Sequence, residues 1–283
     1  MWRILSGIFM GWSLGANDAA NIFGTGVTSR LIRYRTAIIL LSVFVLLGAV
    51  IEGEKCMGSL RNLGDLGFNQ AFFCTLSAAL AITILTVSRI PASPSQAIVG
   101  AIVGAPILVS RPNWAQFMKM VLCWVLTPVG AAVISYLLYK IFEKLFADRI
   151  AGTRQMQTFL KITMIISGCY GAYALGSNNL ANTMGVYINT GMVTPMQGAV
   201  IGALSIALGA ATFSRRVMET VGNRITIIGP QGAVIATLAH SITVHIYTQI
   251  GVPVSSSQAI VGAVAGIGFV RGIKAVNRSV LGQ

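Results

Sequence analysis

The chain has 283 residues, of which 55% are hydrophobic and only 10% are charged. Soluble domains carry about 25% charged residues, so this composition excludes a soluble protein, and the length excludes a single membrane anchor. The formal charge of +13 is interpreted as the Lys and Arg excess of cytoplasmic loops, not as nucleic-acid binding. We expect an all-α, multi-pass protein of the cell (inner) membrane, in contact with the lipid bilayer.

Nine hydrophobic segments follow one another along the chain. They cover approximately residues 2–26, 36–51, 69–87, 93–109, 117–139, 160–188, 192–213, 230–250 and 255–270. A straight helix needs about 20 residues to cross a bilayer, and the segments at 93–109 and 255–270 are the shortest. Both begin at a Pro/Ser motif, so broken or re-entrant helices are expected there as alternatives to simple spans.

Two polar motifs occur twice within this apolar sequence. The residues Leu14–Asn21 return as Leu175–Asn182, and Pro91–Ala101 returns as Pro253–Ala263. The separation between the two copies, which we call the repeat offset, is nearly the same for both motifs. A shared offset between two distant motifs indicates a duplicated unit. Matching interruptions in two halves of a membrane protein are typical of secondary transporters.

The loop charges predict the direction of each half. If all nine segments cross, fifteen Lys and Arg residues face one side of the membrane and five face the other. The positive-inside rule then places the N-terminus outside and the C-terminus inside. An odd number of crossings separates the two copies, which predicts inverted-topology repeats. We expect a first repeat at 1–110, a connecting transmembrane helix and cytoplasmic linker at 111–158, and a second repeat at 159–283.

The first motif is predicted to bind a cation. Asp18 is the one acid deep inside an apolar segment, and buried carboxylates in membranes mark ion or substrate pathways. Carboxylate, amide and carbonyl oxygens are the ligands that hard cations prefer. Packing of helices by Asn and small residues is the alternative interpretation. The candidate sodium ligands are Asn17, Asp18, Asn21, Asn178, Asn179 and Asn182.

The second motif is predicted to bind an anion. Pro and Ser are typical helix-start residues, and a helix start presents free N–H groups and a partial positive charge. Two such starts from opposite halves could hold one oxyanion between them, whereas ordinary helix capping is the alternative. The candidate substrate-binding residues are Ser93, Ser95, Gln96, Ser255, Ser256, Ser257 and Gln258.

The charge balance of these motifs favours symport. Neither motif contains Lys or Arg, and Asp18 adds a negative charge. A divalent oxyanion would therefore need accompanying cations in a low-dielectric site. An anion channel is the rival class, but a fixed carboxylate repels anions. No cluster of His, Asp and Glu and no nucleophile–base pair indicates an enzyme, and no organic cofactor is expected.

The duplicated motifs resemble the paired signatures of the inorganic phosphate transporter (PiT) family. That family carries Gly-Ala-Asn-Asp-x-Ala-Asn and a Pro-x-Ser-x-x-His/Gln-like motif in both halves, and the resemblance extends over the whole chain except the connector. It implies sodium- or proton-coupled uptake of inorganic phosphate by a homodimer of inverted-repeat subunits. It assigns the Asn and Asp residues named above to the signature and the Ser and Gln residues to the substrate-clasping segments.

Departures from the family pattern bear on the coupling ion and the substrate. Asn179 stands where the family commonly has Asp, which predicts one fewer cation or a missing second cation site. Gln96 and Gln258 stand where many members have His, and glutamine cannot titrate. Some relatives carry sulfate, which cannot donate a hydrogen bond at neutral pH. The retained Asp18 therefore favours phosphate as the substrate, and Asn179 weakens that preference towards a sulfate-permease-like member.

The remaining charged and titratable residues receive structural interpretations. Glu52, with Lys55 nearby, is expected to be a snorkelling or ion-paired charge at a segment end, in preference to a gate. His240 is central enough for a proton relay, but a hydrogen-bonded structural role is the favoured interpretation. The four cysteines follow no metal spacing and are expected to be small buried hydrophobes.

Overall fold

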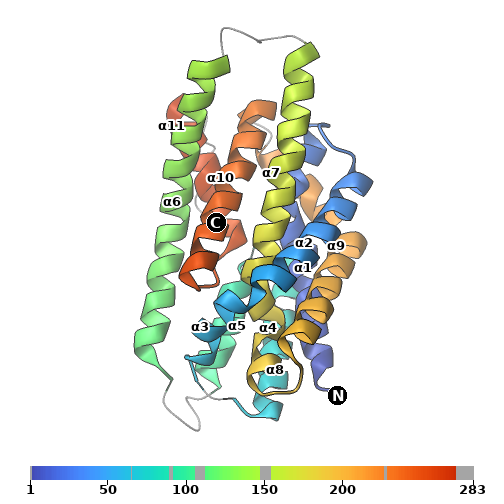
Figure 1. Cartoon of the computed structure of the whole chain (residues 1–283), viewed down its shortest axis with the longest axis vertical. Coiled ribbons are helices and arrows are strands. Elements are labelled where there is room, and N and C mark those ends of the chain that lie inside the picture. The colour runs from blue at the N-terminus through green and yellow to red at the C-terminus, as the bar shows by residue number, and fades with distance from the viewer. Residues whose placement is uncertain are drawn as a thin grey trace.

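The fold is known from a computed structural model that describes residues 2–64, 66–88, 92–105, 112–146, 154–225 and 228–271. All regular secondary structure in these ranges is helical (Figure 1). The elements are α1 (Ile4–Thr28), α2 (Tyr34–Glu52), η1 (Gly53–Cys56), α3 (Met57–Arg61), α4 (Phe68–Val87), α5 (Pro94–Gly104), α6 (Trp114–Phe146), α7 (Arg154–Leu180), η3 (Ala181–Gly185), α8 (Val186–Asn189), α9 (Pro195–Ile225), α10 (Gly229–Ile250) and α11 (Ser256–Arg271). The all-α membrane fold class is thereby confirmed.

Each of the nine predicted segments corresponds to a helix or to a helix with a short continuation. Within the described ranges, five helical stretches are long and apolar enough to cross a membrane. They are Tyr34–Arg61, Phe68–Val87, Trp114–Phe146, Arg154–Asn189 and Pro195–Glu219. Residues 106–109 of the fourth predicted segment and residues 147–153 of the predicted linker lie outside the described residues.

The two shortest apolar helices, α5 and α11, belong to helical hairpins. α5 has 11 residues, which corresponds to about 16 Å, or roughly half the hydrocarbon thickness of a bilayer. It packs against α4, and α11 packs against α10. Ser93 caps α5 and Pro94 occupies its first turn, while Gly251 ends α10 with φ of +80°, a conformation that glycine adopts readily. In Figure 1 the α4–α5 hairpin lies low in the molecule and α10 lies higher.

Glycines let the long helices approach backbone to backbone at matching positions. A Cβ atom at Gly15 of α1 would meet the backbone of Ile206 in α9, and one at Gly176 of α7 would meet the backbone of Val45 in α2. Gly15 corresponds to Gly176 at the repeat offset, and Val45 corresponds to Ile206. Small residues at helix interfaces are what permits such close approach in membranes. The α1–α9 and α2–α7 pairs therefore use equivalent contacts.

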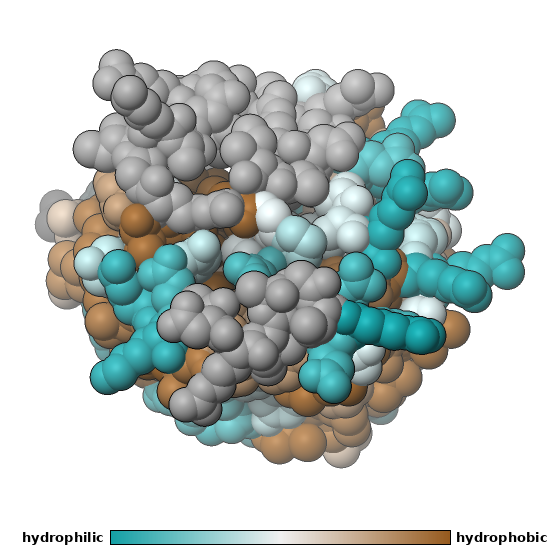
Figure 2. All heavy atoms as spheres, turned by 90° about the horizontal axis from the view of Figure 1, so that it is seen from above, coloured by the Kyte–Doolittle hydropathy of each residue, from teal (hydrophilic) through white to brown (hydrophobic). Residues whose placement is uncertain are grey.

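Helix α6, predicted as the connector, covers the second hairpin. It packs against α10 and α11. A Cβ atom at Gly262 would meet the backbone of Pro128, and one at Gly266 would meet that of Ala132. The outer surface of the molecule agrees with a lipid environment, because apolar side chains such as Val129 are exposed on α6. Figure 2 shows hydrophilic side chains gathered on the end face where α6 ends and α7 begins.

Candidate functional site

The predicted anion-binding segments meet where the two hairpins touch. The contact involves the residues at and just before the starts of α5 and α11 (92–95 and 254–257), which we call the hairpin tips. Ser95 Oγ donates a hydrogen bond to the carbonyl oxygen of Val254 at 2.9 Å. Ser257 Oγ donates to the carbonyl oxygen of Ala92 at 3.0 Å. The two donors occupy equivalent positions in the two copies of the motif, and so do the two acceptors. The structure therefore brings the two helix starts together, as the duplicated motif predicts.

The first and second copies of the Asn motif flank these tips. Asn21 Nδ2 on α1 donates to Ser257 Oγ at 3.1 Å and to Ser256 Oγ at 3.3 Å. Asn182 Nδ2 donates to Ser95 Oγ at 2.8 Å. Asn182 lies in η3, a π-helical turn, and such turns occur frequently at functional sites. Each Asn therefore contacts the hairpin of the other half.

Asp18 and Asn179, one helical turn before these asparagines, accept hydrogen bonds from them. Asn21 Nδ2 also donates to Asp18 Oδ1 at 3.3 Å, and Asn182 Nδ2 donates to Asn179 Oδ1 at 2.7 Å. Asp18 and Asn179 are thus equivalent in position and differ in charge. The structure places the acid of the first half where the second half has a neutral amide.

Asn17 and Asn178 each contact a threonine on the first helix of a hairpin. Asn178 Nδ2 donates to Thr248 Oγ1 at 3.1 Å, and Asn178 Oδ1 accepts from the Val254 N–H at 2.9 Å. Asn17 contacts Thr86 Oγ1 at 2.9 Å, and with its amide turned over it also donates to Asp18 Oδ1 at 3.0 Å. Thr86 and Thr248 were missed by the sequence analysis, although they correspond at the repeat offset and could have been identified by it.

The serines of the second motif are already hydrogen-bonded within the protein. Ser93 Oγ accepts from the Gln96 N–H and Ser255 Oγ accepts from the Gln258 N–H, so both act as helix caps. A hydroxyl has a single proton to donate, and Ser95 and Ser257 give theirs to the carbonyls of the opposite tips. The donors that remain for an anion are first-turn backbone N–H groups, Ser256 and the Gln side-chain amides.

Several buried oxygen atoms at this junction have no hydrogen-bond partner. Asp18 is completely buried, and Asp18 Oδ2, Asn182 Oδ1 and Gln258 Oε1 are unpaired among the described residues. No basic side chain of the described chain lies within ion-pair distance of Asp18. Buried polar atoms normally have partners, and a buried carboxylate needs a compensating charge. Unpaired carboxylate and amide oxygens are a donor set that suits a hard cation.

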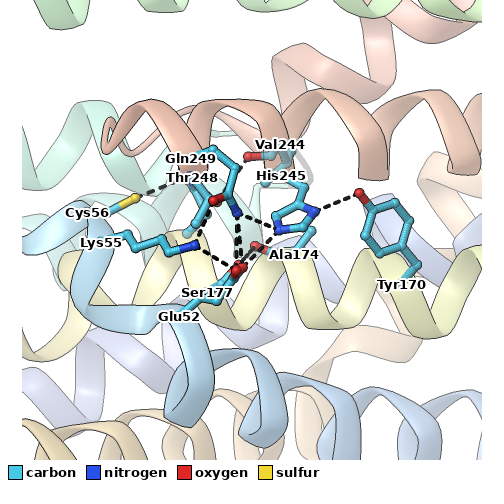
Figure 3. A network of polar contacts seen from close by, with 11 residues as sticks. Glu52, Lys55, Cys56, Tyr170, Ala174, Ser177, Val244, His245, Thr248 and Gln249 are labelled. Carbon is cyan, nitrogen blue, oxygen red and sulfur yellow. Dashed lines mark hydrogen bonds and ion pairs between the residues drawn. The ribbon is translucent and has the colours of Figure 1, made fainter.

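Two further groups near the tips were not assigned to the site from the sequence. His240 Nε2 lies 2.9 Å from Ser256 Oγ, so this histidine adjoins the start of α11. Beside α10, Glu52 contacts Lys55 at 2.7 Å, His245 Nε2 at 2.8 Å and Gln249 Nε2 at 3.2 Å (Figure 3). Tyr170 bonds the other ring nitrogen of His245 at 2.7 Å. Glu52 is ion-paired, as expected, and it joins the end of α2 to the second hairpin.

Comparison with known proteins identifies the family. The model of the phosphate transporter family matches residues 14–283. The chain belongs to this family. It is 33% identical over 279 residues to "Putative phosphate permease MJ0630" of Methanocaldococcus jannaschii, covering 99% of this chain and 88% of that protein. The predicted resemblance to this family and the assignment to a multi-pass membrane protein are thereby confirmed.

Two other matches bear on substrate and fold. "Sulfate permease CysP" of Bacillus subtilis is 29% identical over 273 residues, covering 95% of this chain and 77% of that protein. A solved structure described as "The sodium-dependent phosphate transporter" matches with a TM-score of 0.87 and 23% identity. That match covers 99% of this chain and 91% of the other chain. At this identity the structural match supports the fold.

Proposed function

We propose that this protein is a secondary active transporter that imports inorganic phosphate by sodium symport. The observation that carries the proposal is Asp18, a fully buried carboxylate with one unpaired oxygen and no basic partner among the described residues. A sodium ion supplies the missing charge, and Asn21 connects that position to Ser256 and Ser257 at the hairpin tips. The cation and the anion then stabilise each other's binding.

The two hairpins supply the anion side of the proposed site. The first turns of α5 and α11 meet at the tips, so their N–H groups and dipoles converge on one region. Release of the anion requires the cross-tip bonds of Ser95 and Ser257 to open on one side or the other. Transport then proceeds by movement of one bundle against the other around a fixed site.

Opposite orientation of the two halves supports this mechanism. In Figure 1 α1 starts at the lower end, whereas α7 starts at the upper end. We infer inverted repeats, with the N-terminus outside and the C-terminus inside, from the unequal distribution of basic residues over the two sides. Labelling of single cysteines introduced at Lys55 and at Arg216, in a variant without native cysteines, by an impermeant thiol reagent tests this orientation. Labelling of Arg216→Cys from outside, without Lys55→Cys, contradicts it.

Sulfate transport is the second candidate function. It is supported by Asn179, which removes one carboxylate from the site, and by the similarity to a protein named as a sulfate permease. Uptake of radiolabelled phosphate and sulfate into proteoliposomes, with a sodium gradient, a proton gradient or neither, separates the two. Phosphate accumulation that requires the sodium gradient supports the main proposal. Sulfate accumulation driven by protons alone contradicts it and favours the second candidate.

A further inference from the structure

His240 is a buried histidine with one unpaired ring nitrogen beside the proposed anion site. It lies on α10, is fully buried, and bonds Ser256 Oγ through Nε2 at 2.9 Å. Its Nδ1 has no hydrogen-bond partner among the described residues. An unpaired buried polar atom destabilises the folded protein. A ring nitrogen in this position is therefore available to bind a ligand.

Hydrogen bonds connect His240 to both motifs. Ser256, the first residue of α11, bonds His240 and also accepts from Asn21 Nδ2 at 3.3 Å. Asn21 in turn bonds Asp18. The imidazole thus lies at the start of the helix whose N–H groups are proposed to face the anion, with Ser256 and Asn21 between it and the buried acid.

The first half of the molecule shows that a histidine is unnecessary for packing a hairpin here. At the repeat offset, Ala78 corresponds to His240 and Pro94 corresponds to Ser256. Ala78 and Pro94 are both buried in the α4–α5 hairpin. The imidazole and the hydroxyl therefore exist on one side of the site only. Packing alone does not explain a buried polar pair where the equivalent hairpin uses alanine and proline.

We propose that His240 is part of the anion site and binds one proton together with each anion. This inference rests on the proposed function. Without an anion, an imidazolium would be an uncompensated buried cation, so the ring is neutral. An arriving oxyanion supplies both a hydrogen-bond partner for Nδ1 and the compensating negative charge. By linkage, anion binding favours protonation of His240, and protonation strengthens anion binding by the same factor.

The proposed function assigns Asp18 to the cation, and His240 bonds directly to none of the titratable groups described around α10. From α1, Asp18 faces His240 through Asn21 and Ser256. From α2 and α7, Glu52 and Tyr170 bond His245 instead, and Lys55 of η1 bonds Glu52. The N-terminal turn of α11 contains no ionisable residue, and Cys123 and Tyr139 are the buried titratable residues of α6. A proton taken up with the anion is therefore assigned to His240.

Proton uptake by the purified full-length protein tests this inference. Sulfate is added first, in weakly buffered detergent solution at about pH 6 and about pH 8 with a pH-indicator dye, because its own charge is constant in this range. Wild-type protein is expected to take up about one proton per bound sulfate at about pH 6. His240→Gln is expected to take up none and to bind about tenfold more weakly at that pH. If sulfate does not bind, the same comparison uses inorganic phosphate, whose own titration cancels between the two proteins.

The matched control is His245→Gln, since the chain has only two histidines. This variant is expected to retain proton uptake, which excludes a general effect of losing a histidine from α10. If His240→Gln is unfolded by size-exclusion chromatography, Ser256→Ala, which removes the partner of Nε2, takes its place and is expected to weaken the pH dependence. Anion binding by the wild type without proton uptake, or unchanged uptake in His240→Gln, overturns the inference. Failure of the wild type to bind or transport either anion contradicts the proposed function instead.

Discussion

Ion pairs between side chains hold one flank of the α10–α11 hairpin, whereas aromatic side chains pack on the equivalent flank of the α4–α5 hairpin. On the first flank, Glu52 bonds Lys55, His245 and Gln249 (Figure 3). On the second, Trp12 stacks on Phe9 at 6.0 Å between ring centroids and contacts Phe213 at 5.9 Å.

These two flanks occupy matching positions in the duplicated unit. At the repeat offset, Phe9 corresponds to Tyr170, and Phe213 corresponds to Glu52. The backbone contacts and the Asn–Ser bonds are nevertheless equivalent in the two halves. The comparison indicates that the glycine contacts and the polar motifs determine how the helices are arranged in both halves. The side chains that pack each hairpin against the neighbouring long helices can differ between the halves.

The largest effect on uptake is expected from replacing Asp18, the acid that occupies the position of Asn179 in the other half. Asp18→Asn makes the first half as neutral as the second, so the proposed cation site loses its carboxylate, and uptake is expected to fall about a hundredfold. Asn179→Asp restores the acid in the other half and is expected to increase the dependence of uptake on sodium. Initial rates in proteoliposomes measure both. Wild-type kinetics in a folded Asp18→Asn protein would remove the cation-site role.

Among the described residues, α6 packs closely on the α10–α11 hairpin, and this packing gives a second matched pair of variants. A Cβ atom at Gly262 collides with the Pro128 backbone, whereas one at the equivalent Gly100 meets nothing within 4 Å among the described residues. Gly262→Ala is expected to destabilise the protein by about 1–3 kcal/mol, and Gly100→Ala to leave stability unchanged. Thermal unfolding in detergent provides the measurement. Equal shifts in the two variants would contradict the unequal packing of the hairpins.

The two flanks are expected to respond differently to salt. Glu52→Gln removes charge-assisted bonds to Lys55 and His245, with an expected loss of about 1.5 kcal/mol of stability. Trp12→Phe removes one neutral bond to Thr212 Oγ1 and is expected to cost less. Added salt should narrow the gap between wild type and Glu52→Gln, since ion pairs with partial exposure are screened. A gap that is insensitive to salt would show that packing, and not charge, holds this flank.

The smallest effect is expected where the two halves are most alike. Ser95→Ala and Ser257→Ala each remove one cross-tip bond to a carbonyl and one bond accepted from an asparagine of the opposite half. Buried bonds of this kind in membranes are worth about 0.6 kcal/mol each. The two variants should therefore lose similar stability in thermal unfolding experiments. A large loss in one variant and none in the other would show that the tips are not equivalent.

From the sequence, only those candidate site residues could be identified that belong to a motif repeated at the same offset in both halves. Asn21 and Asn182 were identified because both copies of the motif are long, and the structure places both in contact with the opposite hairpin. Their role as sodium ligands stays a prediction. Thr86 and Thr248 were missed because a single Thr in an apolar helix carries no motif. His240 was assigned a structural role because its partner, Ser256, lies on the next helix, and the spacing of apolar residues does not predict contacts between helices.

By itself the sequence determined that the protein is a duplicated, helical, multi-pass membrane protein with two polar motifs per half. These properties follow from composition, hydrophobic length and a constant offset, all of which are local or repetitive signals. Only the tertiary structure decided that Ser95 and Ser257 donate to carbonyls, that Asp18 Oδ2 and His240 Nδ1 are unpaired among the described residues, and that Glu52 joins α2 to α10. The physical reason is that hydrogen-bond partners and burial depend on residues far apart in the chain, which no local pattern brings together.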